Sequence, residues 1–500
     1  MHDAQFDVAV VGCGPVGACL ANLLAQCGLT VLVLDKETHM YGLPRAVHFD
    51  DETMRVFQTV GIASSLAERV RVNPGMRFVD KNGNILIDWP RPSAVGMHGW
   101  HPSYRLHQPD LEQLLRETLQ THANVTAEFG VELVQLEQQQ TGVVLKCRQS
   151  TSSKACQYTA SYVVGCDGAG SIVRSLMQAE FTDFGYHERW LVVDVLLNHD
   201  IPDLGDYTLQ FCDSKQPMTY CRNPGLRRRW EMSVEHLRAK NISNNALCHP
   251  DHIWPLLSRW ITPEQAEIER SAVYTFRSAV VNNWQRNRLL LCGDAAHLTP
   301  PFMGQGLCAG IRDASNLAWK LALVVRQKAE DTLLESYAHE RAPHVTQYIR
   351  KAIELGQTIN ALPHNPTAPS TSQPKPMSSI APLLGESQYC LFTSPVADNT
   401  RILFSQPTLC TGVRLDDAIG YEWVLLTRTG FNTKRVDSGN MIDLSASANP
   451  EIASALDAHG LSAVLVRPDR YIEATATTPE QAALLAAMQL PTCQSSAAKP

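Results

Sequence analysis

The sequence predicts an α/β protein: a doubly wound parallel sheet, an inserted antiparallel sheet and a smaller α/β domain at the C-terminal end. Three observations lead to this fold class. Short apolar runs at residues 6–11, 162–165 and 288–292 each pass into a glycine turn. Residues 184–276 mostly alternate as strands, with few helical stretches between them. A proline- and serine-rich stretch at 363–376 has the composition of a linker.

The first unit has the spacing of a dinucleotide-binding turn. The strand at 6–11 is followed by Gly12, Gly14 and Gly17, then by a helix with apolar residues at helical spacing. The first glycine makes the turn, the second lets the backbone approach a pyrophosphate, and the third lets helix and strand pack closely. Asp35 ends the next strand, where an acid can bind a ribose. Dinucleotide binding is the prediction, and a glycine-tolerant βαβ turn without a ligand is the alternative.

Composition excludes several classes of partner. The chain has 500 residues, 44% of them hydrophobic, and a net charge of −7, which gives no reason to expect nucleic acid or an anionic membrane. The N-terminal segment lacks a signal-peptide pattern and no apolar run is long enough to span a bilayer, so a cytoplasmic protein is expected. The 14 cysteines are scattered without zinc-ligand spacing, which predicts reduced thiols and no metal site.

Two candidate residues lie on the loop after Asp35. Arg45 is placed to contact a pyrophosphate or a ring system, or else to form an ordinary surface ion pair. His48 is a candidate catalyst, although a lone histidine is more often a structural residue. Asp50 or Asp51 then caps a helix.

The motif of strand, glycine and acid occurs twice more. Asp167 follows the strand at 162–165, and Gly293 and Asp294 follow the strand at 288–292. The second of these motifs continues into Pro300-Pro301 and a glycine-rich helix start. Rigid prolines and a cluster of backbone N–H donors suit a large planar ring that becomes negatively charged on reduction.

The strands at 184–276 predict a substrate-binding sheet. Within them, the basic cluster from Arg222 to Arg229 either meets an anionic substrate or a nicotinamide-cofactor phosphate, or forms a solvated hairpin. Tyr220 and Arg222 are the candidate substrate contacts. The predicted organisation is given by the following ranges: a dinucleotide-binding domain at 1–183 with excursions, the substrate-binding sheet at 184–276, a return to the first domain with long helices at 277–355, a linker at 356–390 and a C-terminal domain at 391–500.

Together these motifs resemble the single-component FAD-dependent aromatic hydroxylases. The first domain is then a Rossmann-type FAD-binding domain. Pro44-Arg45-Ala46 before Asp50-Asp51-Glu52, and the late run Val466-Arg467-Pro468-Asp469-Arg470-Tyr471, are similar to the 3-(3-hydroxyphenyl)propionate hydroxylase branch. That resemblance implies a thioredoxin-like C-terminal domain, here without a CxxC pair.

The resemblance also implies a set of FAD-binding residues. Pro301 matches the proline that faces the reactive edge of the flavin, while Cys308 departs from the asparagine common in relatives. The matching positions are Gly12, Gly14, Pro15, Val16, Gly17, Asp35, Lys36, Arg45, Gln108, Asp167, Gly293, Asp294, Pro301, Gly304, Gln305, Gly306, Leu307 and Cys308.

The activity implied is hydroxylation of a phenolic substrate, a hydroxyphenylpropanoid or another small phenol, ortho to its hydroxyl, with NADH or NADPH and O₂ through a C4a-hydroperoxyflavin. His48, with a pKa near the working pH, is the expected base and substrate contact. A second dinucleotide loop is absent, so the nicotinamide cofactor is expected to bind transiently. A hydroxylase of a larger polycyclic compound and a flavin-binding regulatory protein are the alternatives, and the oligomeric state is left open, with a homodimer as one option.

Overall fold

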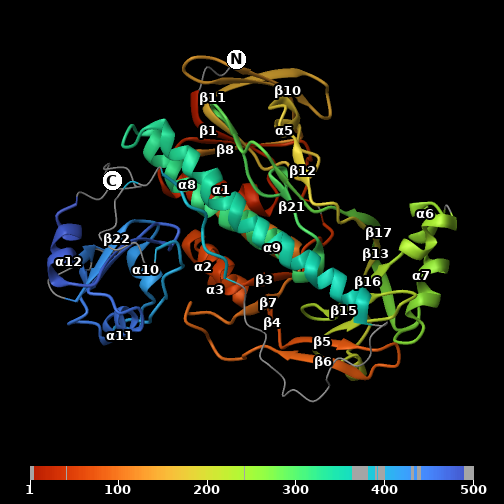
Figure 1. The fold of residues 1–500 in the computed structure, drawn as a ribbon. Helices are drawn as coiled ribbons and strands as arrows, with labels where there is room; N and C mark the ends of the chain where they lie inside the picture. Colours follow the sequence, from red (N-terminus) through yellow and green to blue (C-terminus); the bar gives the residue numbers. More distant parts are fainter. Residues whose placement is uncertain are drawn as a thin grey trace.

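The structure is a computed structural model (Figure 1). It describes residues 5–40, 42–240, 242–362, 381–388, 391, 400–428, 433–435 and 441–488. The proline-rich stretch predicted at 363–376 lies outside the described residues. The predicted linker boundary at residue 356 is wrong, because helix α9 (Glu335–Ala361) continues through it.

The first domain is built on an eight-stranded sheet. Its parallel strands follow the order β20-β11-β1-β2-β8, and β19, β10 and β9 add antiparallel pairs. Because the parallel strands end at one edge of the sheet, Gly12, Asp35, Asp167 and Gly293 lie along that edge. The strands are β1 (Gln5–Val11), β2 (Val31–Asp35), β8 (Val125–Phe129), β9 (Val131–Gln138), β10 (Val143–Gln149), β11 (Ala155–Gly165), β19 (Gln285–Arg286) and β20 (Leu289–Leu291).

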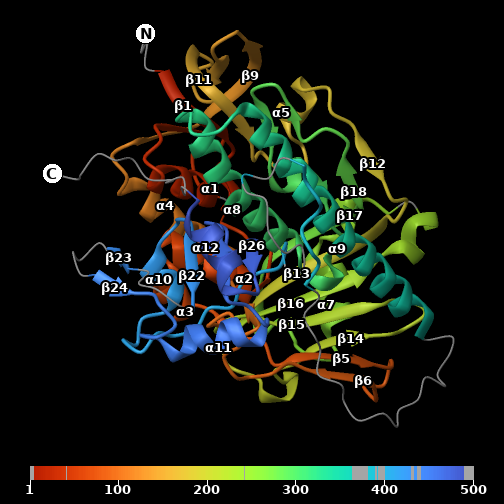
Figure 2. The same cartoon turned by 60° about the vertical axis from the view of Figure 1, so that its left-hand side comes forward.

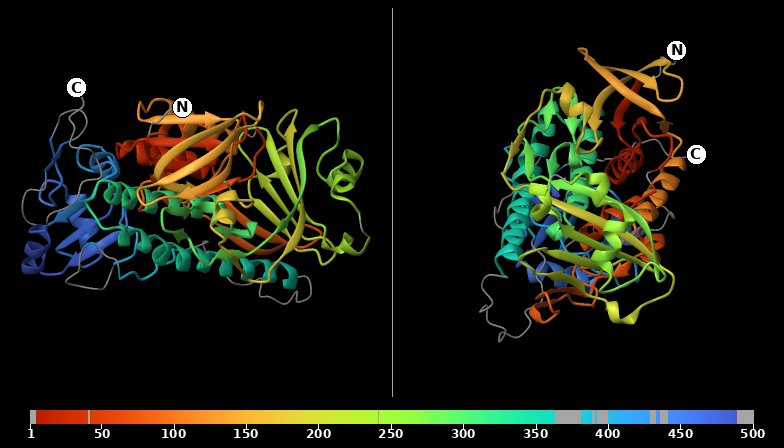
Figure 3. Two further views of the ribbon diagram at one scale, coloured as in Figure 1. Left: turned by 90° about the horizontal axis from the view of Figure 1, so that it is seen from above. Right: turned by 90° about the vertical axis from the view of Figure 1, so that its right-hand side faces the viewer.

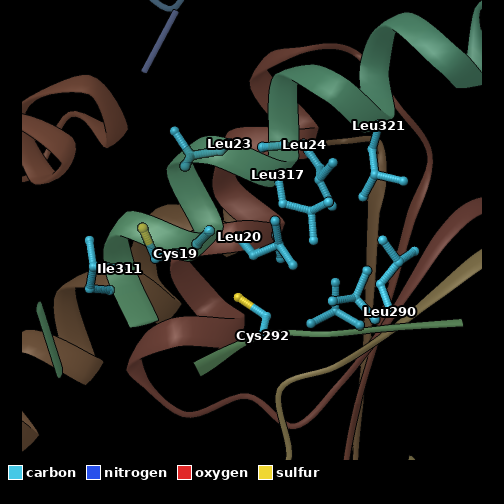
Figure 4. Packing of buried hydrophobic residues seen from close by; sticks show 14 of the residues in the cluster. Cys19, Leu20, Leu23, Leu24, Leu290, Cys292, Ile311, Leu317 and Leu321 are labelled. Atoms are coloured by element: carbon cyan, nitrogen blue, oxygen red, sulfur yellow. The ribbon is translucent and has the colours of Figure 1, made fainter. Parts of the chain in front are cut away.

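Helices α1 (Pro15–Gln26) and α8 (Gly306–Val325) pack against one another and against this sheet. Leucines of both helices, among them Leu20 and Leu317, fill the space between them above β20 (Figure 4). Gly310 permits this approach, since a Cβ there would lie 2.5 Å from Val16 Cγ2. Full burial of each leucine stabilises the folded state by about 1.5–3 kcal/mol, so the turns at the sheet edge are supported by a well-packed core.

A second sheet of seven strands lies beside the first domain. Its order is β17-β13-β16-β15-β14-β5-β6. The hairpin β5–β6 comes from residues 75–90, and β5 pairs with β14 in parallel, so this sheet is neither purely antiparallel nor confined to the predicted range 184–276. The strands are β5 (Gly75–Val79), β6 (Ile85–Pro90), β13 (Glu188–Leu197), β14 (Thr208–Phe211), β15 (Met218–Arg222), β16 (Arg227–Ser233) and β17 (Ala266–Phe276).

The two faces of the seven-stranded sheet differ in what covers them. The outer face packs on helices α6 (Asn244–Leu247) and α7 (Pro250–Leu257), which lie at the right of Figure 1. The inner face turns toward the first domain, because its Arg229 hydrogen-bonds to the carbonyl oxygen of Pro44 at 2.9 Å. Side chains alternate between these faces along each strand.

Small sheets and short helices join the two large sheets. The sheet β3-β7-β4 carries His48 beside helix α2, which Asp50 caps by accepting a hydrogen bond from Thr53 N at 3.0 Å. The long α9 reaches the seven-stranded sheet, where Ile359 packs near Phe78. The remaining elements of this part are β3 (His48–Asp50), α2 (Asp51–Val60), α3 (Ala63–Ala67), β4 (Arg71–Val72), β7 (Ser103–Arg105), α4 (Gln108–Gln120), α5 (Ile172–Leu176), β12 (Phe181–Asp183), β18 (Ala279–Val281) and β21 (His297–Leu298).

The C-terminal domain lies at the end of the molecule opposite the seven-stranded sheet (Figures 1 and 3), and Figure 2 turns this domain toward the viewer. Its sheet β22-β25-β26 is antiparallel, and α12 follows it. The thioredoxin-like assignment stays a prediction. The described elements are α10 (Leu415–Ile419), β22 (Val424–Thr427), β23 (Thr433–Arg435), β24 (Met441–Asp443), α11 (Pro450–Ala458), β25 (Ala463–Val466), β26 (Ile472–Ala476) and α12 (Pro479–Ala486).

Buried polar contacts fix the C-terminal domain to the first domain. Arg467 donates to both oxygens of Glu340 on α9, at 3.0 and 2.8 Å. Arg55 on α2 donates to both oxygens of Asp416, at 2.8 and 2.9 Å. None of the helices among the described residues combines the length and the apolar character needed to cross a membrane.

Candidate cofactor and substrate site

The three glycines of the first turn have different structural requirements. Gly12 has φ +99°, and a Cβ there would lie 2.6 Å from the Cys166 carbonyl oxygen. A Cβ at Gly17 would lie 1.9 Å from the Gly12 carbonyl oxygen. A Cβ at Gly14 would meet no atom of the described chain within 4 Å, and no described side chain caps the start of α1. The turn therefore leaves open space in front of uncapped N–H groups, which is what a phosphate requires.

Asp35 is held in place beside this turn. Its Oδ2 accepts a hydrogen bond from Cys13 N at 2.8 Å and its Oδ1 accepts one from Glu37 N at 2.9 Å. Arg116 lies 3.8 Å from the same carboxylate and donates to the Cys13 carbonyl oxygen at 2.9 Å. Lys36 is exposed next to it. These contacts fix the acid at the sheet edge without using all of its acceptor sites.

A buried carboxylate, that of Asp313, accepts a hydrogen bond from the turn at Gly293. Asp313 accepts hydrogen bonds from Gly293 N at 3.2 Å and from His297 Nε2 at 2.6 Å. The neighbouring Asp294 is accessible, yet desolvation by the surrounding chain raises its pKa, against the opposing charges of His297 and Arg45. The charge of Arg45 thus acts on the Asp294 carboxyl.

The carboxylate of Asp167 accepts hydrogen bonds from its own chain. Its Oδ1 accepts from Ser171 Oγ at 2.5 Å, and its Oδ2 accepts from the backbone N–H groups of Ile172 and Val173 at 2.7 and 3.2 Å. These bonds cap the start of α5, and burial raises the pKa of the carboxyl. The contacts of Asp167 favour a structural role over the predicted contact to a cofactor.

A second uncapped helix start faces the same edge. Pro301 begins a short turn that ends at Gly304, whose φ is +63°. Gly306 opens α8, and a Cβ at this glycine would meet none of the described atoms within 4 Å. The N-cap residue Gln305 makes no side-chain cap; it donates to Asp50 at 3.3 Å and accepts from Arg312 at 3.1 Å. This leaves backbone N–H donors toward open space, as the sequence predicts.

The other predicted cofactor residues line or support these turns. Pro15 starts α1, and Val16 packs under Gly293, where a Cβ would lie 3.2 Å from it. Leu307 is half-buried in the first turn of α8. Gln108 fixes the loop of Arg45, because its Oε1 accepts from Ala46 N at 2.7 Å.

Cys308 is fully buried at the start of α8. Its Sγ donates to the Gly304 carbonyl oxygen at 3.9 Å, and burial raises the pKa of the thiol to about 12. Cys308 therefore remains a neutral thiol that closes the Gly304 turn from inside.

His48 differs from its predicted role as a base. Burial, followed by the charges of Arg91 and Arg105, lowers its pKa from 6.5 to about 3, so the predicted pKa near the working pH is wrong. Nδ1 lies 3.2 Å from the Gly304 carbonyl oxygen, which can only accept, so Nδ1 carries the proton. Nε2 then accepts from Ser103 Oγ at 2.8 Å. Both ring nitrogens are used, and His48 holds the Gly304 turn as a neutral imidazole.

The two predicted substrate contacts point away from the first domain. Tyr220 is buried in the outer-face cluster and packs on Trp230. Arg222 pairs with Asp206 at 2.6 Å and with Asp200 at 3.2 Å. Both predictions are corrected for the same reason: alternate residues of β15 face opposite sides of the sheet, and these two face outward.

Arg229 of the basic cluster lies on the inner face and binds the first domain. It donates to both oxygens of Asp194, at 2.6 and 2.9 Å, and to the carbonyl oxygens of Pro44 and Arg45, at 2.9 and 2.7 Å. Arg270 adds a bond to Pro44 at 2.6 Å. The period-two pattern of residues 227–233 separates this arginine from Arg228, but the sequence does not say which face is inner.

Known proteins resemble this chain over most of its length. The family model described as FAD binding domain matches residues 5–352. A probable NADH-specific resorcinol 4-hydroxylase of Rhodococcus jostii (strain RHA1) is 41% identical over 351 residues, which cover 70% of this chain and 65% of that protein. A 3-(3-hydroxy-phenyl)propionate/3-hydroxycinnamic acid hydroxylase 2 of Burkholderia vietnamiensis (strain G4 / LMG 22486) is 31% identical over 523 residues, which cover 94% of this chain and 93% of that protein. The matched stretch thus spans less than two thirds of the first relative's length and nearly all of the second.

Solved structures share the fold. The flavin-dependent monooxygenase PieE, in complex with FAD and substrate, superposes with a TM-score of 0.80 at 18% identity, covering 96% of this chain and 97% of that one. Aklavinone-11 hydroxylase, in a complex with FAD and aklavinone, superposes with a TM-score of 0.77 at 21% identity, covering 97% of this chain and 98% of that one. These likenesses extend through the C-terminal domain. With its sheet edge, its two uncapped helix starts and the family match over residues 5–352, the chain belongs to the FAD binding domain family.

Proposed function

We propose that this chain is an FAD-dependent monooxygenase that uses NADH or NADPH and O₂ to hydroxylate a small phenolic compound. The observation that carries the proposal is the pair of uncapped helix starts, at Gly14 and Gly306, on one sheet edge. The names of the relatives, a resorcinol hydroxylase and hydroxyphenylpropionate hydroxylases, support a phenolic substrate. A cytoplasmic location and a homodimer stay predictions.

The residues present fit FAD. Gly14 and the start of α1 would hold its pyrophosphate, and Asp35 would bind the adenosine ribose. Asp294 and Arg45, whose charges act on one another, would contact the middle of the molecule. The N–H groups at Gly306 would bind the ring system. When bound, FAD accepts a hydride from the nicotinamide cofactor and activates O₂ for transfer of one oxygen atom.

The chain's own part is to position the ring and to keep water away. His48 donates to the Gly304 carbonyl oxygen and thereby fixes the turn from Pro301 to Gly304. Phe302 in that turn packs on Trp190 of the inner face, with ring centroids 5.7 Å apart. Apolar walls of this kind exclude water from the reacting atoms, which limits loss of reducing equivalents to H₂O₂.

The test is oxidation of NADH and NADPH by the FAD-loaded protein with a panel of phenols, following O₂, H₂O₂ and product mass together. The expected result is strong stimulation by one phenol, a product heavier by one oxygen atom, and little peroxide. Stimulation with peroxide alone would point to a larger polycyclic substrate. Absence of NAD(P)H oxidation under every condition would support the regulatory alternative and contradict the proposal.

A further inference from the structure

Within the described part of the chain, one buried arginine on the inner side of the site has no acidic partner. Arg105, on β7, is 8% exposed, and its side chain donates from Nη2 to Thr208 Oγ1 on the inner face of β14. Among the described residues, no carboxylate lies within 4.0 Å of this guanidinium. A guanidinium buried without a counter-charge is unfavourable, and an anionic ligand would supply that charge.

A second arginine lies close to the first. Arg91 follows β6, and its backbone N–H donates to the Pro74 carbonyl oxygen at 2.9 Å. Burial, together with the charge of Arg105, lowers its pKa, while Asp50 and Asp51 act in the opposite sense. Like Arg105, it forms no ion pair within 4.0 Å among the described residues.

The nearby acids already bind other groups. Asp50 accepts from Arg312 at 2.5 Å, and Asp51 from His98 at 2.9 Å. On the inner face, Glu231 lies 3.5 Å from Arg229, and burial raises its pKa. These carboxylates lower the local potential without supplying either arginine with a direct partner.

The two arginines are placed near the proposed ring site. Arg105 is the cross-strand partner of His48, whose imidazole contacts the Gly304 turn. Thr208, which Arg105 contacts, occupies the inner face, as does Arg229. Arg105 therefore lies between His48, which contacts the turn before α8, and the inner face, and the charge of Arg91 acts on both His48 and Arg105. This is where we place the substrate.

We propose that Arg105 and Arg91 bind an anionic oxygen group of the aromatic substrate, a carboxylate or a phenolate. This inference rests on the proposed function, because it takes the site between α8 and the inner face as the substrate site. The planar guanidinium offers paired N–H donors that match either group, and its weak hydration suits a buried position. These residues take the role that the sequence predicts for Tyr220 and Arg222.

The experiment measures the dissociation constant of each compound from the change in the flavin absorption spectrum of the oxidised holoenzyme. The probes are 3-(3-hydroxyphenyl)propionate, its uncharged primary amide, and resorcinol. The variants are R105M, R91M and the charge-retaining R105K. The matched control is R222M, which removes an arginine from the outer face. FAD affinity is measured for each variant separately.

The expected result is a loss of affinity of at least ten-fold for an anionic probe in R105M and R91M, partial rescue in R105K and no change in R222M. If the carboxylate is the bound group, the propionate loses affinity while the amide binds weakly to every form. If a phenolate is bound, all three probes weaken together, and binding to the wild type tightens as pH rises toward the phenol pKa.

Two results would overturn the inference. Equal affinities in R105M and the wild type would remove the substrate role, and loss of FAD affinity without loss of probe affinity would assign the arginines to the cofactor. Binding that depends on Arg105 without any hydroxylated product would instead contradict the proposed function and leave the anion site intact. The two failures are therefore distinguishable.

Discussion

Arg229 on β16 donates a hydrogen bond to the carbonyl oxygen of Pro44 at 2.9 Å, across 185 residues of sequence. The same guanidinium is neutralised by Asp194, which lies beside it on β13. The inner face of the seven-stranded sheet thus holds the loop that presents Arg45 to the sheet edge. The loop that carries Arg45 and the seven-stranded sheet are thus hydrogen-bonded to one another. A substitution on the sheet is therefore expected to change the affinity for FAD.

Arg229→Lys tests this connection. Lysine keeps the charge but cannot make the forked contact with Asp194 and reach two carbonyl oxygens at once. We expect the free energy of unfolding to fall by about 1–3 kcal/mol and FAD to bind more weakly, because the Arg45 loop loses support. Urea unfolding and FAD titration measure the two effects. Arg222→Lys on the outer face is the control, and equal effects of both variants would contradict the connection.

Gly14→Ala and Gly17→Ala are expected to differ sharply. A methyl group at Gly14 meets no atom of the described residues within 4 Å, so the apoprotein loses only about 0.5–1 kcal/mol, the difference between glycine and alanine at an N-cap, while the methyl group occupies the proposed phosphate space. At Gly17 the same group would lie 1.9 Å from the Gly12 carbonyl oxygen, so the apoprotein is destabilised. Thermal unfolding of the apoprotein and FAD titration distinguish them. Unchanged FAD affinity in Gly14→Ala would argue against this phosphate site.

His48→Gln is expected to change how stability depends on pH. The pKa of His48 falls from 6.5 to about 3 on folding, so between these values the unfolded chain binds the proton more readily. The wild type therefore loses about 1.4 kcal/mol per pH unit below pH 6.5 that the glutamine variant does not lose. Urea unfolding at pH 7.5 and pH 5 should show a relative change of about 2 kcal/mol.

The pH–rate profile of the same variant checks the corrected role of His48. As a neutral positioning residue it has no titration near neutrality, so His48→Gln should lower turnover without moving any inflection of the profile. Disappearance of an inflection near pH 6.5 in the variant would restore His48 as the base.

Glu340→Gln tests how the C-terminal domain is held. Glu340 accepts from Lys320 at 2.9 Å and from Arg467 at 2.8 and 3.0 Å, and these charges hold its pKa well below the usual range. Removing the charge leaves two buried cations short of a partner, which costs about 3–5 kcal/mol. Urea unfolding followed by tryptophan fluorescence measures this loss of stability, because Trp319 and Trp423 pack together with ring centroids 5.3 Å apart.

The exposed Glu354, paired with Lys351, supplies the control for this prediction. Glu354→Gln should change stability by less than about 0.5 kcal/mol. A similar small effect of both variants would mean that the interface does not depend on Glu340.

Local patterns predicted what short stretches of chain determine by themselves. The strand, turn and helix around Gly12, Gly14 and Gly17, and the position of Asp35, follow from nearest neighbours, and the FAD-binding family is confirmed. Tyr220 and Arg222 were misassigned because the alternation in β15 defines two faces but not which one helices α6 and α7 cover.

Other features depend on residues far apart in the sequence. The pKa of His48 is set by burial and by Arg91 and Arg105, which other elements supply. The hairpin β5–β6 joins the second sheet because β5 pairs with β14 in parallel, and no local sequence pattern predicts this pairing. Asp167 follows a strand like Asp294, yet it caps the next helix, and only the contacts distinguish the two.

The most direct test of the central claim is a reaction of the FAD-loaded protein with NADH and 3-(3-hydroxyphenyl)propionate or resorcinol under ¹⁸O₂, with the product analysed by mass spectrometry. The account predicts one labelled oxygen atom in the aromatic product for each NADH consumed. A product that carries oxygen from water, or consumption of NADH that returns all of the label as peroxide with every phenol, would contradict it.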